Sequence, residues 1–237
     1  MNLRSHALSD IGRVRAENED SFLHDPGHGL YAVADGIGGL PAGAQASQTA
    51  IAAIQDIFSR PAMFAKPDYA AALAEINERV FQLGRTLSAR MGIGTTLTFG
   101  HVSDQKLHVT QVGDSLLLRV RGGSIQQLTS EHNIENEVRQ RIARGESVGL
   151  VLENRLALTR CVGQPPPLEG EHLEFALQKS DRYLFCSDGV TRMVEQREIA
   201  ARLVGCEGPE AWATALIGLA NDRGGYDNST AVALFVD

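Results

Sequence analysis

Residues 30–39 have the sequence LYAVADGIGG, in which an apolar run of strand-forming residues ends at Asp35 and a glycine-rich turn follows. The run predicts a buried strand, and the turn leads into 42–58, where apolar residues recur at helical spacing. A strand that stops at a carboxylate presents that side chain at the rim of a sheet. This stretch therefore predicts a strand–turn–helix unit with an acidic group at the sheet edge.

Other parts of the chain also place carboxylates beside apolar stretches. The four acidic segments are 15–20 (RAENED), 35–39 (DGIGG), 187–189 (SDG) and 227–228 (DN). Carboxylates gathered at one rim would repel each other unless cations lay between them. Because hard divalent cations prefer oxygen ligands, the pattern predicts a divalent metal site and metal-assisted hydrolysis.

Asp35 and Gly36 are the centre of this prediction. A carboxylate has two oxygens and can bridge two cations, and the unobstructed carbonyl of Gly36 can supply another oxygen ligand. Asp188 and Asp227 can then hold one of the cations. An isolated Asp-Gly is more often an ordinary turn, and a single Asp at such a position is more often a cap, so the prediction depends on the segments acting together.

The roles of the remaining candidates stay open at this stage. Alternation sends Glu19 and Asp20 to opposite faces, so that one could bind a cation directly and the other through water. Asp114, between two predicted strands, is either a hairpin residue or part of a third cation site shared with Asp188. Arg15 has a planar fork that can hold two phosphate oxygens, and Arg13 is its rival.

Composition and motifs exclude several other classes of protein. The formal net charge of −7 argues against nucleic acid and anionic membranes as partners. The chain has no GxGxxG, P-loop or HExxH motif, which disfavours nucleotide-binding folds and zinc. Three scattered cysteines suit a reducing compartment, and no secretory leader or membrane span is evident. We therefore expect a cytoplasmic protein.

The hydrophobic pattern predicts an α+β protein of one domain, residues 1–237, with a β-sandwich core covered on both sides by helix pairs. The polar segment 131–164 contains one predicted helix, 134–143, and is expected to bury little and to form a flap. The other predicted helices are 42–58, 68–91, 196–204 and 209–221, and the predicted strands lie within 3–35 and 95–128 and over 172–177, 182–186 and 229–236.

Several segments together resemble the metal-dependent protein phosphatases of the protein phosphatase 2C family, especially the short bacterial catalytic-domain forms. The resemblance runs from about Ser9 to Ala233. The matching segments are 10–15 (DIGRVR) with 18–20 (NED), 33–39 (VADGIGG), 94–96 (GTT), 112–115 (VGDS), 158–160 (LTR), 187–189 (SDG) and 227–228 (DN). The fold it implies is a four-layer αββα sandwich, with two antiparallel β-sheets flanked by helix pairs.

The resemblance also implies roles for the acidic residues. Asp35 would bridge two Mn²⁺ or Mg²⁺ ions, and the Gly36 carbonyl would join one of them. Asp188 and Asp227 would hold the other ion, with Glu19 and Asp20 supporting the site. Asp114 would join Asp188 at a third, weaker metal site. Arg15 would bind the phosphate, and segment 131–164 would be the variable flap beside the active site.

The activity implied is that of a protein serine/threonine phosphatase, in which a metal-bridging hydroxide attacks phosphorus. Its partners would be phosphoproteins and a bacterial Ser/Thr kinase, in a system such as type VI secretion, and we expect a monomer. Ile37 and Leu40 stand where relatives often have histidine, and Gln45 where an acidic residue is common. Leaving-group protonation is therefore assigned to a metal-bound water.

Two alternatives remain. One keeps the chemistry with another substrate, such as a phosphorylated small molecule or phosphotyrosine. The other is a catalytically silent module that binds phosphoproteins.

Overall fold

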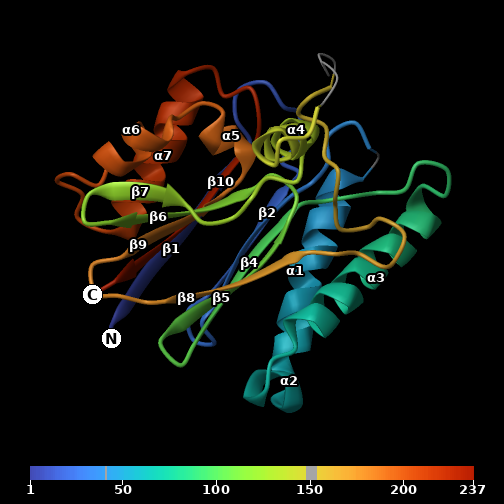
Figure 1. The fold of residues 1–237 in the computed structure, drawn as a ribbon, viewed down its shortest axis with the longest axis horizontal. Helices are drawn as coiled ribbons and strands as arrows, with labels where there is room; N and C mark the ends of the chain where they lie inside the picture. Colours follow the sequence, from blue (N-terminus) through green and yellow to red (C-terminus); the bar gives the residue numbers. More distant parts are fainter. Residues whose placement is uncertain (41, 148–153) are drawn as a thin grey trace.

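Two antiparallel five-stranded sheets form the centre of the molecule, as seen in a computed structural model that describes residues 1–40, 42–147 and 154–237 (Figure 1). The first sheet contains, in spatial order, β1 (Leu3–Asp10), β10 (Ser229–Val236), β9 (Arg182–Cys186), β6 (Leu116–Arg121) and β7 (Ser124–Gln127). The second contains β2 (Asp20–Asp25), β3 (Leu30–Asp35), β4 (Leu97–Ser103), β5 (Lys106–Val112) and β8 (Glu171–Ala176).

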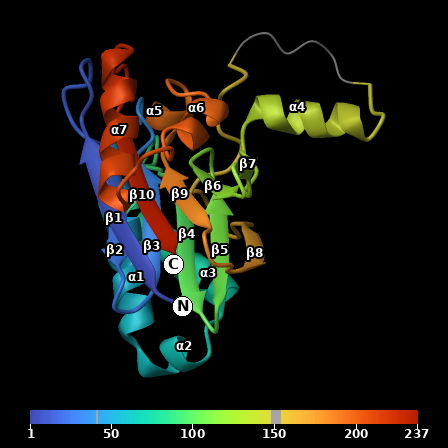
Figure 2. The same cartoon turned by 90° about the vertical axis from the view of Figure 1, so that its left-hand side faces the viewer.

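Helices cover the outer face of each sheet. The second sheet is covered by α1 (Gly43–Ser59) and α3 (Tyr69–Leu87), with the short α2 (Pro61–Ala65) between them in sequence. The first sheet is covered by α5 (Asp188–Thr191), α6 (Gln196–Ala201) and α7 (Pro209–Asp222). Figures 1 and 2 show these helix groups on opposite sides of the stacked sheets. The predicted four-layer αββα sandwich is confirmed.

Three apolar clusters hold the layers together. One joins α1 and α3 to the second sheet through residues such as Ile54 and Ile76, and another joins α7 to the first sheet around Trp212. The third lies between the sheets and includes Tyr31, Tyr183 and Phe185. Burial of such large side chains stabilises a fold by roughly 1.5–3 kcal/mol each.

The sequence located most elements to within a few residues. Helix α4 (Ile134–Ala143) matches its predicted bounds, and in Figure 2 it projects away from the sheets. The prediction for 68–91 was too long: α3 ends at Leu87, and Gly92 N–H donates to the Ser88 carbonyl in a separate turn. The short α2 and α5 were not predicted, because neither is long enough to show helical periodicity.

The predicted flap, residues 131–164, was expected to bury little. Helix α4 indeed contains no buried residue, but His132 and Asn133 just before it are 5% and 3% exposed. Residues 148–153 of this segment lie outside the described residues. None of the described helices is both long and apolar enough to cross a membrane.

Gly100 is a point where the two sheets approach closely. A Cβ at this position in β4 would lie 2.5 Å from Phe185 Cζ, in the cluster between the sheets. We expect Gly100→Val to lower the free energy of unfolding by about 1–3 kcal/mol, because overpacking forces neighbours apart.

Urea unfolding of purified protein would measure this change. Gly218→Ala is the control: Gly218 lies in α7, where a Cβ would meet no neighbouring atom, so alanine should stabilise the protein by about 0.5–1 kcal/mol. Equal effects of the two substitutions would contradict the packing argument.

Candidate active site

Strand pairing brings the four acidic segments to one rim of the sandwich. Asp20 is directly opposite Asp35 in the β2–β3 ladder. Because β9 and β10 are antiparallel neighbours, Asp188, after the end of β9, lies near Asp227, before the start of β10. Asp114 follows β5 and precedes β6, whose first residue pairs with Cys186 at the end of β9.

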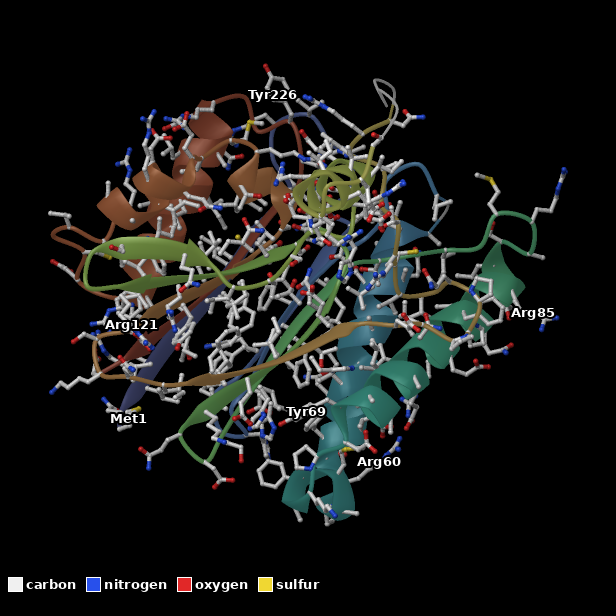
Figure 3. All side chains as sticks on the ribbon, viewed as in Figure 1. Met1, Arg60, Tyr69, Arg85, Arg121 and Tyr226 are labelled. Atoms are coloured by element: carbon white, nitrogen blue, oxygen red, sulfur yellow. The ribbon has the colours of Figure 1, made fainter. Side chains whose placement is uncertain are left out.

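A cavity of about 510 Å³ opens at this rim. It lies at the end of the molecule opposite the termini, where Figure 3 shows the exposed Tyr226, the residue before Asp227, at the upper edge. Its lining includes the side chains or backbone of Arg15, Asp35, Gly36, Asp114, Leu156, Asp188, Arg192 and Asp227. The cavity therefore gathers predicted residues from five separate parts of the chain.

Asp35 and Asp20 are neighbours in this cluster, and Asp20 is only 8% exposed. Burial raises the pKa of Asp35 well above its ordinary value, and the neighbouring carboxyls of Asp20 and Asp188 raise it further. Burial also raises the pKa of Asp20 to about 6, although Thr230 and Ser187 hydroxyls donate to its Oδ2 at 2.7 and 2.8 Å. The structure thus fixes one oxygen of Asp20 and leaves Oδ1 buried without a hydrogen-bond partner among the described residues.

Asp227 and Asp188 line the opposite side of the cluster. Arg15 Nη2 donates to Asp227 Oδ2 at 2.9 Å, which places the guanidinium at the mouth of the carboxylate group. Burial raises the pKa of Asp188, and Asp227 adds to the rise. Asp188 Oδ1 is a second buried oxygen with no hydrogen-bond partner among the described residues.

The two adjacent acids Glu19 and Asp20 are separated by the strand alternation that the sequence indicated. Asp20 points into the cluster, whereas the Glu19 carboxyl lies against Gly43, the first residue of α1. The Glu19 carbonyl accepts hydrogen bonds from Gly36 N–H at 3.1 Å and Ser47 Oγ at 2.6 Å. Glu19 therefore lies at the periphery and ties the Asp35–Gly36 turn to α1.

Threonines hold the backbone of Asp35 in place. The Asp35 N–H donates to Thr96 Oγ1 at 3.0 Å, and its carbonyl accepts from Thr95 Oγ1 at 2.8 Å and Thr96 N–H at 2.8 Å. Sequence reasoning identified these threonines only as part of a matching motif. Ser187 and Thr230, which bind Asp20, were not predicted to do so, because a single hydroxyl beside an acidic motif has no distinctive spacing.

Asp114 lies in the turn between β5 and β6, as the hairpin interpretation predicted, and it is also a close neighbour of Asp188. Burial raises the pKa of Asp114 to about 7, and Asp188 adds to the rise. Arg192 Nη2 lies 2.5 Å from Asp188 Oδ2 and 3.6 Å from Asp114 Oδ2. Sequence reasoning missed Arg192; its signal was the spacing of four from Asp188 in a segment entering a helix, which places both side chains on one face.

The donor set fits divalent cations chemically, although it is not preset as a ligand shell. Among the described residues, no three His, Cys, Asp or Glu side chains already surround one point that could hold a metal ion. Arg15 and Arg192 draw one oxygen each of Asp227 and Asp188 to themselves. The buried, unpartnered oxygens of Asp20 and Asp188 and the raised carboxyl pKa values are those of a site that lacks positive charge.

Comparison with known proteins identifies the family. Residues 13–216 match the family described as Protein phosphatase 2C, which is most of the chain. The chain belongs to the protein phosphatase 2C family. The resemblance predicted from the acidic motifs is thereby confirmed.

Relatives of this phosphatase 2C chain match over nearly its full length. Protein phosphatase PhpP of Streptococcus pneumoniae is 30% identical over 231 residues, covering 94% of this chain and 93% of PhpP. Among solved structures, PppA, a key regulatory component of T6SS in Pseudomonas aeruginosa, has a TM-score of 0.86 at 29% identity, covering 100% and 99% of the two chains.

A third relative concerns the metal. The catalytic domain of the serine threonine protein phosphatase PstP, solved in complex with two manganese ions, has a TM-score of 0.81 at 31% identity, with 99% of each chain covered. These relatives confirm the predicted enzyme class, that of the protein serine/threonine phosphatases.

We expect the stabilisation of the fold by bound metal to depend on pH, because the carboxylates of the cluster titrate. Asp20 and Asp114 have folded-state pKa values of about 6 and about 7, above the unfolded value of about 4. Their neutral forms favour the folded state, so the metal-free protein loses stability as pH rises from about 4 through 7. A rise of one unit in a pKa corresponds to about 1.4 kcal/mol. Cations bind the deprotonated forms.

We therefore expect the increase in Tm caused by Mn²⁺, measured against chelator by differential scanning fluorimetry, to be several degrees larger at pH 8 than at pH 5. An increase of the same size at both pH values would show that these carboxylates do not bind the ion.

Proposed function

We propose that this protein hydrolyses phosphoserine and phosphothreonine in proteins, using divalent cations held by the carboxylate cluster. The observation that carries the proposal is that Asp35, Asp188 and Asp227 line one cavity with Arg15 at its mouth, and that the carboxyl of Asp20 lies behind them as a close neighbour of Asp35. Two of these carboxyls have buried oxygens that no described residue satisfies. A phosphate monoester is the substrate that needs both the cations and the arginine.

The residues divide into three proposed roles. Asp35 would hold both Mn²⁺ or Mg²⁺ ions, the Gly36 carbonyl would join one of them, and Asp188 and Asp227 would hold the other. Asp20 would support the metal site, and Glu19 would stabilise the turn that contains Gly36. When bound, the two ions would supply Lewis-acid charge and a water of lowered pKa.

Arg15 is proposed to orient the phosphoryl group. Its side chain is 39% exposed, lines the cavity and is paired with Asp227. If Asp227 served as a cation ligand, the guanidinium fork of Arg15 would be free to donate to two phosphoryl oxygens. Gly38 allows this position, because a Cβ there would lie 2.7 Å from Arg15 Nη1. Arg15 therefore has both the charge and the freedom to move that phosphate binding requires.

No described residue that lines the cavity is a histidine. Ile37 and Leu40 occupy the lining where relatives resembling this chain often have one. We therefore assign the proton for the leaving oxygen to water. Substrate access is proposed to involve the segment that carries α4, since Leu156 to Leu158, which follow that helix in sequence, line the cavity.

The cellular setting is also a proposal. Similarity to PppA supports a role in regulating a type VI secretion system. We further propose a cytoplasmic monomer whose partners are a Ser/Thr kinase and its phosphoprotein targets. Similarity to PstP, with its two manganese ions, supports Mn²⁺ as a cofactor. The single-domain organisation over 1–237 with a flap at 131–164 belongs to the same proposal.

Asp35→Asn tests the chemistry. We expect phosphate release from a phosphothreonine peptide with Mn²⁺ to fall by at least about 100-fold, since even residues that only support metal ligands contribute 10–100-fold. Asp104→Asn is the matched control: Asp104 is exposed in the β4–β5 turn at a φ of 50°, which asparagine adopts readily, and turnover should not change.

Chelator should abolish turnover of the wild type as well. Metal-independent turnover, or full activity of Asp35→Asn, would refute the proposed mechanism. No turnover by a folded wild-type protein that binds Mn²⁺ would favour the phosphoprotein-binding alternative.

Arg15→Ala tests phosphate binding separately from the ions. Loss of a charge-assisted, two-pronged contact should raise KM for the phosphopeptide by about 10–100-fold. Arg13→Ala, an exposed neighbour that packs on Gly225, should leave KM within about twofold. Equal effects of the two substitutions in steady-state kinetics would remove the special role of Arg15.

A further inference from the structure

Arg192 lies between two acidic side chains of the active site. Its Nη2 is 2.5 Å from Asp188 Oδ2 and 3.6 Å from Asp114 Oδ2. The turn that begins at Asp188 positions it, since the Arg192 N–H donates to the Asp188 carbonyl at 2.8 Å. Among the described residues, these two acids are the ion-pair partners of Arg192, and its guanidinium reaches the outer side of Asp188.

The two acids need a positive charge at this point. The Asp114 and Asp188 side chains are only 8% and 13% exposed, whereas that of Arg192 is 41% exposed. Two nearly buried carboxylates side by side repel each other, and a nearby cation removes most of that repulsion. Arginine is suited to the task because it stays charged and presents several donors in a rigid fork.

The two oxygens of Asp188 have different surroundings. Arg192 holds Oδ2, whereas Oδ1 is buried and has no hydrogen-bond partner among the described residues. An arginine on the outer oxygen fixes the carboxylate plane, and the inner oxygen stays available to the cluster around Asp35. Arg192 therefore acts on the site through Asp188, as a positioning residue.

We propose that Arg192 is a built-in cation that occupies the space between Asp114 and Asp188. The active site would then bind two divalent ions around Asp35 and exclude a third ion from the space that Arg192 fills. This inference rests on the proposed function for the two inner ions. It departs from the sequence-based expectation of a third ion held by Asp114 and Asp188, because the guanidinium already lies at the position that such an ion would need.

Arg192→Met tests the proposal, since methionine keeps much of the length of the side chain and removes the charge. We expect equilibrium dialysis with Mn²⁺ to give two bound ions per wild-type chain and three per Arg192→Met chain, the added one weaker by tenfold or more. Arg192→Met/Asp114→Asn should return to two. Arg202→Met, an exposed arginine at the end of α6 with no ion pair among the described residues, is the control and should bind two.

The second measurement uses no metal. In chelator at pH 8, Arg192→Met should lower Tm by about 3 °C or more relative to Arg202→Met, because Asp114 and Asp188 then lack their cation. Adding Asp114→Asn should recover most of that loss, and Arg192→Lys should lose less than Arg192→Met.

The outcomes separate the two proposals. Three ions in the wild type, or two in Arg192→Met, would overturn the exclusion of a third ion. A metal-free Tm that Arg192→Met does not change would overturn the built-in cation. Failure of every variant to bind Mn²⁺ would instead remove the proposed function, and the metal-free Tm would still decide the role of Arg192.

Discussion

The repulsion among carboxylates buried at one rim is the constraint on which the rest of the site depends. Asp20, Asp35, Asp114 and Asp188 are all largely removed from water; burial raises the pKa of each, and a neighbouring carboxylate adds to the rise. A protein does not retain such a group without a source of positive charge, because isolated buried charges are strongly unfavourable. The arginines at the two ends of the cluster supply part of that charge, and the donor chemistry leaves room for divalent cations to supply the rest.

The acidic side chains are held in place by rigid backbone and short hydroxyl side chains rather than by long side chains. Asp35 ends a strand whose other residues are all buried, and Thr95 and Thr96 hold its N–H and carbonyl groups. Asp20 is held at one oxygen by hydroxyls from the far sheet, Ser187 and Thr230, so the two sheets are joined at the site itself. Because strand pairing fixes the register, a one-residue slip would move the strand residues Asp20, Asp35 and Thr230 to the wrong face.

The sequence predicted the layers, most strands and the acidic residues, because periodicity and strand ends are local features. It could not decide between Glu19 and Asp20, since alternation says that they differ but not which faces the core. The structure places Asp20 inside and Glu19 against Gly43, at the start of α1. Arg192 was missed because its role depends on Asp114, which is far away in sequence and adjacent only after the β6–β9 pairing forms.

The two arginines of the site differ in a way that follows from what each one contacts. Arg15 holds Asp227, an acid of the inner cluster, through a single 2.9 Å contact, and its guanidinium lies against Gly38. In the proposed mechanism Arg15 would give up Asp227 to a cation and turn to the phosphate. Arg192 holds one oxygen of Asp188 and is tied by its backbone to the same turn, so under the proposed function it would stay in place when ions bind. The guanidinium of Arg15 can thus exchange its partner, whereas that of Arg192 keeps its partner as a fixed part of the structure. Both conditions follow from the same excess of buried negative charge.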